Sequence, residues 1–167
     1  MEQTMLTPSL TQLRQQLNDY PAAPAVYSVL WDYATPVAVF DRLRREHHCC
    51  FLLESADHSS AGGRYSFLGF SPRLEIAIRQ HTAQVKSPEG VAEHRVENPM
   101  EFLRNLMKPY RTPTVPGLPK FTGGLIGYFG YDTVRYLEPT LTNVGEDDLK
   151  MPDCHLFLYD EIVAFDH

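Results

Sequence analysis

The chain has 167 residues, of which 43% are hydrophobic and 22% charged, and this is enough for a folded domain with a real core. Its net charge of −6 and its isoelectric point near 5.6 argue against nucleic acid as a main partner. No apolar run reaches the roughly 18 residues of a membrane span, and the polar N-terminus, residues 1–19, is not a secretory signal.

The cysteines are Cys49, Cys50 and Cys154. An odd number without the pattern of a small disulfide scaffold predicts free thiols in a reducing compartment, so we expect a cytoplasmic protein. We expect residues 1–167 to form a single domain. The sequence stops directly after an apolar, strand-like run, whereas domains usually finish with a few loose polar residues, so we expect this chain to be part of a longer one.

Three helices are predicted, each by a capping side chain that precedes a proline suited to the first helical turn. The pairs are Thr7-Pro8, Thr35-Pro36 and Asn98-Pro99. Behind each pair, apolar residues recur at the spacing of a helix with one buried face.

Strands are predicted from short runs rich in β-branched or aromatic residues. The shorter runs are residues 25–31, 50–55, 65–70, 74–78 and 82–86. The last two should form a hairpin that turns near Gln80-His81. The longest apolar runs, residues 121–129 and 155–165, are expected to be central strands, at least in part. This mixture favours an α+β fold with mainly antiparallel β-sheets and a few flanking helices.

Three patterns invite a functional interpretation, and we favour a structural one for each. The glycines of residues 123–130 match neither nucleotide-binding fingerprint, so we expect them to admit a neighbouring backbone or to mark a bulge. Residues 47–50 (His-His-Cys-Cys) cannot converge on one metal ion, because adjacent strand residues face opposite sides, and we interpret them as a helix end leading into a strand. Asp160 and Glu161 diverge likewise; one should face solvent and the other should pair with a cation.

The most informative local pattern is an apolar strand that ends in polar groups. Residues 50–53 are followed by Glu54 and Ser55, and after a glycine-containing turn Arg64 opens a second apolar stretch. This pattern suits a small amphoteric ligand such as an amino acid. The ligand's ammonium would bind Glu54 or a hydroxyl, and its carboxylate would bind Arg64 or backbone N–H groups. Its apolar part would pack against leucine and aromatic side chains. On the pattern alone, an ordinary strand end is the more frequent alternative.

Three stretches of this sequence resemble the N-terminal region of anthranilate synthase component I. The first runs from Thr35-Pro36-Val37 through residues 51–55 (FLLES) to residues 63–69 (GRYSFLG). The second is residues 121–132 (FTGGLIGYFGYD), and the third is Pro152-Asp153 followed by residues 160–167 (DEIVAFDH). The resemblance extends in order from about Tyr27 to the end of the chain.

The resemblance implies a lyase of tryptophan biosynthesis that converts chorismate to anthranilate and pyruvate. A glutamine amidotransferase subunit would supply the ammonia. Chorismate and Mg²⁺ would bind a C-terminal catalytic domain that is absent from this chain. We therefore expect no catalytic residue, no metal site and no cofactor here, and no turnover by this chain alone.

The resemblance also implies a feedback site for the inhibitor L-tryptophan, which the protein's own C-terminal domain would complete. Its residues here would be Leu53, Glu54, Ser55, Arg64, Tyr65, Ser66 and Phe67. On a regular strand Leu53 and Ser55 share one face, and Leu52 and Glu54 share the other. We therefore expect Ser55 to use its side chain and Glu54 mainly its backbone, unless a bulge intervenes.

Two alternatives stay open. One is the same region of aminodeoxychorismate synthase component I, from the folate pathway, although the FLLES and GRYSF motifs favour anthranilate synthase. The other is a non-catalytic docking module for the amidotransferase subunit.

Overall fold

The computed structural model describes residues 5–54, 64–138, 140–141 and 147–167 of the chain. Its helices are α1 (Leu10–Asp19), α2 (Pro36–Glu46) and α3 (Pro99–Leu106), together with the 3₁₀ helices η1 (Lys108–Tyr110) and η2 (Tyr131–Tyr136). Its strands are β1 (Met5–Thr7), β2 (Val26–Ser28), β3 (Cys50–Leu53), β4 (Tyr65–Phe70), β5 (Leu74–Arg79), β6 (Thr82–Ser87), β7 (Gly90–Arg95), β8 (Gly124–Phe129), β9 (Cys154–Tyr159) and β10 (Ile162–Asp166). All strand pairs are antiparallel, which confirms the predicted α+β class.

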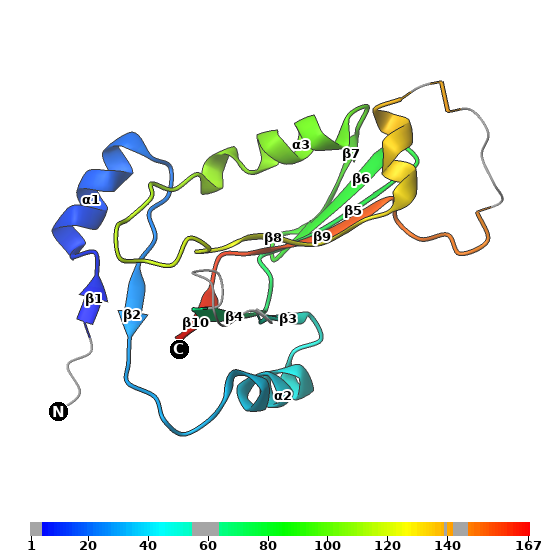
Figure 1. Cartoon of the computed structure of the whole chain (residues 1–167). Coiled ribbons are helices and arrows are strands. Elements are labelled where there is room, and N and C mark those ends of the chain that lie inside the picture. Colours follow the sequence, from blue (N-terminus) through cyan, green and yellow to red (C-terminus); the bar gives the residue numbers. More distant parts are fainter. Residues whose placement is uncertain (1–4, 55–63, 139, 142–146) are drawn as a thin grey trace. The chain divides into compact units, whose positions relative to one another are not determined.

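The chain forms two compact units, and each is described by itself. Unit 1 comprises Met1–Ser71, Leu106–Thr122 and Glu161–His167, and unit 2 comprises Pro72–Asn105 and Gly123–Asp160. Unit 1 contains the pair β1-β2 and a three-stranded sheet of order β10-β4-β3 (Figure 1). Unit 2 contains a five-stranded sheet of order β7-β6-β5-β9-β8 (Figure 1).

Two of the three predicted helix starts are confirmed. Thr35 caps α2, where its hydroxyl accepts from the Ala38 N–H at 3.2 Å. The Asn98 side chain accepts from Met100 N–H at 2.9 Å at the start of α3.

The predicted start of the first helix is wrong. Thr7 belongs to β1 and pairs with Val26, so its backbone is committed to a strand. Ser9 is the N-cap of α1 instead, and Ser9 and Gln12 bond reciprocally as a capping box.

The core of unit 2 lies on one face of its sheet. Ile76, Ile78 and Leu158 are at most 1% exposed. On the same face, His94 of β7 meets Phe102 of α3 with ring centroids 5.5 Å apart, so α3 lies against this side. The alternation of buried and half-buried residues along β5 is that of a strand with one packed face.

The predicted hairpin is confirmed. Strands β5 and β6 pair from Arg79 opposite Thr82, and Gln80 and His81 have φ angles of 47° and 63°. Positive φ at both central residues is typical of the two-residue turn that matches strand twist. Strand β7 was not predicted; the side chains along it are all exposed and give no apolar alternation.

The expectation of two long central strands is only partly correct. Strand β8 covers only Gly124–Phe129 and lies at an edge of the sheet in the described part of the chain. Residues 155–165 form two strands in different sheets: β9 is internal to the sheet of unit 2, and β10 is an edge of the sheet of unit 1. The sequence alone could not divide this run, because both halves are apolar.

Other predicted ranges changed at their ends. The strand expected at residues 25–31 is limited to β2, and the strand expected at residues 50–55 ends at Leu53. No helix in the described residues has both the length and the apolar content needed to cross a membrane.

Candidate functional site

The register of the three-stranded sheet decides which predicted site residues share a face. Leu53 of β3 lies opposite Phe67 of β4, and Phe51 lies opposite Gly69. Because side chains alternate along a strand, Tyr65 lies on the same face as Phe67 and Gly69. We call this side, with Phe51, Leu53, Tyr65 and Phe67, the aromatic face.

The aromatic face is completed by Phe121, which lies two residues after Pro119. Its ring meets Phe67 edge-on at 5.3 Å and Phe51 at 6.3 Å between centroids. The rings of Tyr65 and Phe67 lie 5.9 Å apart. Aromatic pairs with centroids at these distances attract one another, so the rings form one packed cluster.

Gly69 makes room for this cluster. A Cβ atom built at Gly69 would collide with the ring of Phe51 on the neighbouring strand. The glycine of the Phe-Leu-Gly sequence is therefore required by a ring that crosses over it, not by a turn.

Leu53 is the last residue of β3, and Glu54 follows it directly. The Leu53 side chain is 44% exposed, and Glu54 is exposed just after the strand. Ser55 lies outside the described residues, so the division of roles expected between Glu54 and Ser55 stays a prediction.

Arg64 has a partner that the sequence analysis missed. Its Nε donates to Asp166 Oδ1 at 2.6 Å and its Nη2 donates to Asp166 Oδ2 at 2.7 Å. The guanidinium also lies 5.0 Å from the ring centroid of Tyr65. The hydrogen bonds from Arg64 lower the pKa of Asp166 from its ordinary 3.8, so the carboxylate stays ionised to lower pH than usual.

Ser66 lies on the opposite face from Tyr65 and Phe67. It is only 3% exposed, and its hydroxyl is hydrogen-bonded to the ring of His167, with Oγ and Nε2 2.7 Å apart. Leu68, on the same face, is fully buried. The contiguous segment expected to bind a ligand is therefore divided between two sides of the sheet.

Helix α2 packs on β3 and β4. Its C-cap residue His47 stacks on Phe70 with ring centroids 4.9 Å apart and is hydrogen-bonded to Ser71 at 2.9 Å. Strand β3 begins soon after, at Cys50. This confirms that residues 47–50 are a helix end leading into a strand.

The structural interpretation of the glycine-rich stretch is also supported. Gly127 of β8 has φ +156°, and a Cβ atom there would collide with the backbone carbonyl of His155 on β9.

Asp160, one of the two adjacent carboxylates, accepts from Arg73 Nη1 at 3.1 Å, as expected for one of the pair. Neither feature leaves groups converging on a substrate.

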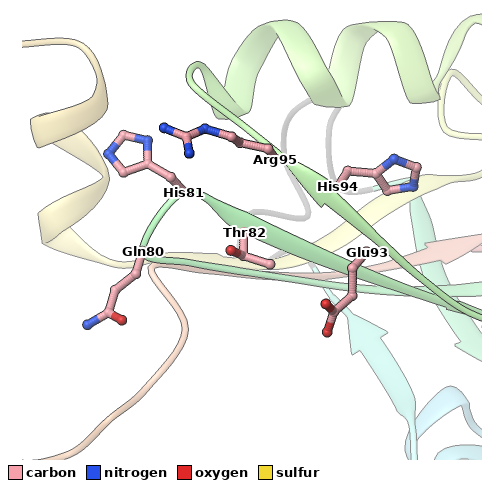
Figure 2. A pocket seen from close by; sticks show the side chains of 6 residues that line it. All are labelled: Gln80, His81, Thr82, Glu93, His94 and Arg95. Atoms are coloured by element: carbon pink, nitrogen blue, oxygen red, sulfur yellow. The ribbon is translucent and has the colours of Figure 1, made fainter.

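A polar hollow lies on the β6–β7 hairpin of unit 2. Its lining residues are Gln80, His81, Thr82, Glu93, His94 and Arg95. Figure 2 shows that Glu93 and His94, adjacent on β7, point to opposite sides of the hairpin, so the lining groups do not converge on one ligand. Among the described residues, no three side chains of His, Cys, Asp or Glu gather as a possible metal site.

The relatives found among curated proteins agree with one another, as described below. No family model matches the chain. It is 36% identical over 163 residues to anthranilate synthase component 1 of Acetivibrio thermocellus, which covers 98% of this chain and 33% of the relative. It is 37% identical to anthranilate synthase component 1 of Pseudomonas aeruginosa, covering 93% of this chain and 32% of the relative. It is 38% identical to the chloroplastic anthranilate synthase alpha subunit 1 of Oryza sativa subsp. indica, and this match covers 90% of this chain and 28% of the relative.

A solved structure is also similar, that of anthranilate synthase component I from Streptococcus pneumoniae TIGR4. The TM-score is 0.50 and the sequence identity 27%, over 80% of this chain and 27% of that one. The chain thus spans about a third of the length of the curated relatives it matches.

Proposed function

Because this chain is homologous to about one third of anthranilate synthase component 1, we propose that it is the tryptophan-sensing region of such an enzyme. The whole protein would convert chorismate to anthranilate and pyruvate, with ammonia from a glutamine amidotransferase subunit. Each relative described above is named anthranilate synthase, which favours this branch over aminodeoxychorismate synthase.

The aromatic face carries this proposal. An indole ring needs flat apolar walls, and Leu53, Tyr65 and Phe67 supply them at the open end of the sheet. The ligand's ammonium would be placed at the end of β3, where Glu54 is exposed and Ser55 follows in sequence. The protein's own C-terminal domain would cover the ligand from the other side.

Regulation follows from differential affinity. Tryptophan would bind more tightly to a state of the whole enzyme with low activity, and it would shift the population only by that difference. Because this chain would supply only part of the pocket, it should bind tryptophan more weakly than the complete protein, by about tenfold for each 1.4 kcal/mol of missing contact.

Catalysis would belong to the remainder of the protein. We assign no catalytic residue to this chain and derive no step through Mg²⁺, which would bind with chorismate in the C-terminal domain. An odd number of cysteines without the pattern of a small disulfide scaffold is typical of a reducing compartment, and we extend the proposal to a cytoplasmic location on that ground. An assay of the chain with chorismate, ammonia and Mg²⁺ should give no anthranilate fluorescence, and production of anthranilate would contradict this assignment.

Calorimetric titration with L-tryptophan tests the proposed site. Leu53→Ala should weaken binding about fivefold, since losing the apolar contact of one exposed leucine with a ligand costs roughly 1 kcal/mol. Val91→Ala is the matched control, because Val91 is also an exposed apolar strand residue, 62% exposed, but lies on β7 of unit 2. Absence of heat with the wild-type chain and with the complete protein, or equal effects of the two substitutions, would contradict the proposal.

The docking-module alternative makes a different prediction. It requires the chain to bind the amidotransferase subunit with an affinity that L-tryptophan and Leu53→Ala leave unchanged. Sedimentation of the mixed subunits separates that outcome from the tryptophan site.

A further inference from the structure

Two short segments far apart in sequence are tied together beside the aromatic face. Asp166 holds the Arg64 guanidinium by two hydrogen bonds, of 2.6 and 2.7 Å. The backbone N–H of His167 donates to the Arg64 carbonyl at 2.9 Å. The His167 ring is hydrogen-bonded to the buried Ser66 hydroxyl at 2.7 Å. We call the Arg64–Asp166 pair the clamp.

The clamp lies at the last paired position of β10. Strands β10 and β4 pair from Ile162 opposite Gly69 to Asp166 opposite Tyr65. Asp166 therefore projects from the same face as Tyr65, because directly opposed residues of antiparallel strands share a face. Arg64 precedes β4, and its guanidinium nonetheless lies 5.0 Å from the centroid of the Tyr65 ring. The carboxylate of Asp166 thus brings the guanidinium onto the aromatic face.

This arrangement gives Arg64 a different role from the one expected. A guanidinium donates in a fixed fork, and the edge formed by Nε and Nη2 is already taken by a carboxylate of the protein. A ligand carboxylate could use that edge only by displacing Asp166. The cation instead stacks beside Tyr65, which favours one position of that ring.

We propose that Asp166 is a positioning residue of the tryptophan site: it fixes Arg64 beside Tyr65 and so sets the wall of the aromatic face against which the ligand packs. This inference rests on the proposed function. It makes the affinity for tryptophan depend on a residue of β10 that need not touch the ligand. It also means that removing the Asp166 carboxylate weakens tryptophan binding. If Asp166 and the ligand instead competed for Arg64, removing that carboxylate would strengthen tryptophan binding.

The experiment compares four proteins by calorimetry with L-tryptophan: wild type, Asp166→Asn, the exchanged pair R64D/D166R, and Asp147→Asn. Asp166→Asn should weaken binding about fivefold or more, since it removes one charge from a bidentate pair. The exchanged pair should recover most of that loss, because the ion pair is restored with its members reversed. Asp147→Asn breaks a matched exposed pair, Arg79 with Asp147 at 2.6 Å in unit 2, and should leave affinity unchanged.

An independent readout follows the clamp itself. A bonded Arg64 Nε–H should give a resolved signal in a ¹H–¹⁵N spectrum, which Asp166→Asn should abolish while the dispersion of the backbone amides is kept. Should Asp166→Asn fail to fold, Arg64→Lys replaces it; lysine keeps the charge but not the fork, and it should also weaken binding.

The outcomes are distinct. Unchanged or tighter binding by Asp166→Asn overturns the inference, as does an exchanged pair no better than Asp166→Asn or an equal loss in Asp147→Asn. Failure of both the wild-type chain and the complete protein to bind tryptophan overturns the proposed function instead, and the Arg64 signal would still show whether the clamp forms.

Discussion

At the scale of single residues, the aromatic face depends on alternation along two strands. Tyr65 and Phe67 lie on it with Leu53, whereas Ser66 between them is buried on the other side against His167. A segment that is continuous in sequence would therefore contribute to the proposed ligand site through every second side chain. Ser66 would act on the site through the sheet that it helps to hold, and not through contact with the ligand.

Gly69 offers a direct test of the packing behind the site. Gly69→Ala should lower the free energy of unfolding by about 1–3 kcal/mol, because an added methyl would force the Phe51 ring out of its place. Urea denaturation followed by circular dichroism measures this. The double variant F51L/G69A should regain part of the loss, since leucine lacks the ring. A Gly69→Ala protein as stable as the wild type would contradict the assigned role of the glycine.

At the scale of elements, η2 is fastened to the β5–β6 turn by a small polar network. The Tyr136 hydroxyl donates to Asp153 Oδ2 at 2.7 Å and accepts from the His81 N–H at 3.2 Å. The same carboxylate oxygen accepts from the Gln80 N–H at 3.0 Å. These bonds satisfy the N–H groups of a turn held in the left-handed region, which helps this turn to form without glycine or asparagine.

The network predicts a loss of stability at high pH. Burial first, and then the hydrogen bond to Asp153, raise the pKa of Tyr136 from 10.0 to about 12. The folded state therefore keeps a proton that the unfolded state loses, and the stabilisation present below pH 10 declines as the pH rises towards 12.

Thermal unfolding between pH 9 and 12 measures this effect in wild type and Tyr136→Phe. The variant should be less stable at pH 9 by about 1–2 kcal/mol, since a hydrogen bond is lost, and its stability should decline less steeply above pH 10. Tyr131→Phe is the control, because Tyr131 is 93% exposed on the same 3₁₀ helix. Parallel pH curves for wild type and Tyr136→Phe would contradict the assignment.

At the scale of the whole molecule, two stretches of chain pair in both units. Gly69 lies opposite Ile162 in unit 1, and Leu74 lies opposite Leu158 in unit 2. Both pairings are antiparallel, and the two sheets are separate. Each unit therefore takes neighbouring strands from the same two stretches of chain.

Amide hydrogen exchange should follow the order of strands in the five-stranded sheet. Amides of β5 and β9 should exchange most slowly, because these strands are internal to the five-stranded sheet and Ile76, Ile78 and Leu158 are at most 1% exposed. Strand β7, an edge strand with exposed side chains, should exchange fastest within that sheet. Mass spectrometry of peptides after timed labelling measures both, and equal protection of β5 and β7 would contradict this expectation.

The sequence by itself determined the features that depend on neighbouring residues. Asn98-Pro99 and Thr35-Pro36 predicted helix starts because a cap bonds within its own first turn. Residues 65–70 and the β5–β6 hairpin were predicted because alternation and a two-residue turn are local signals. The resemblance to anthranilate synthase component I also required only the order of motifs.

Only the tertiary structure decided which strands become neighbours. It divided residues 155–165 between two sheets, placed β8 at an edge, and turned Ser66 away from Tyr65. It also paired Arg64 with Asp166, 102 positions away in sequence. The physical reason is that strand pairing and ion pairs over such separations are fixed by the whole chain's packing, whereas caps and turns are complete within a few residues.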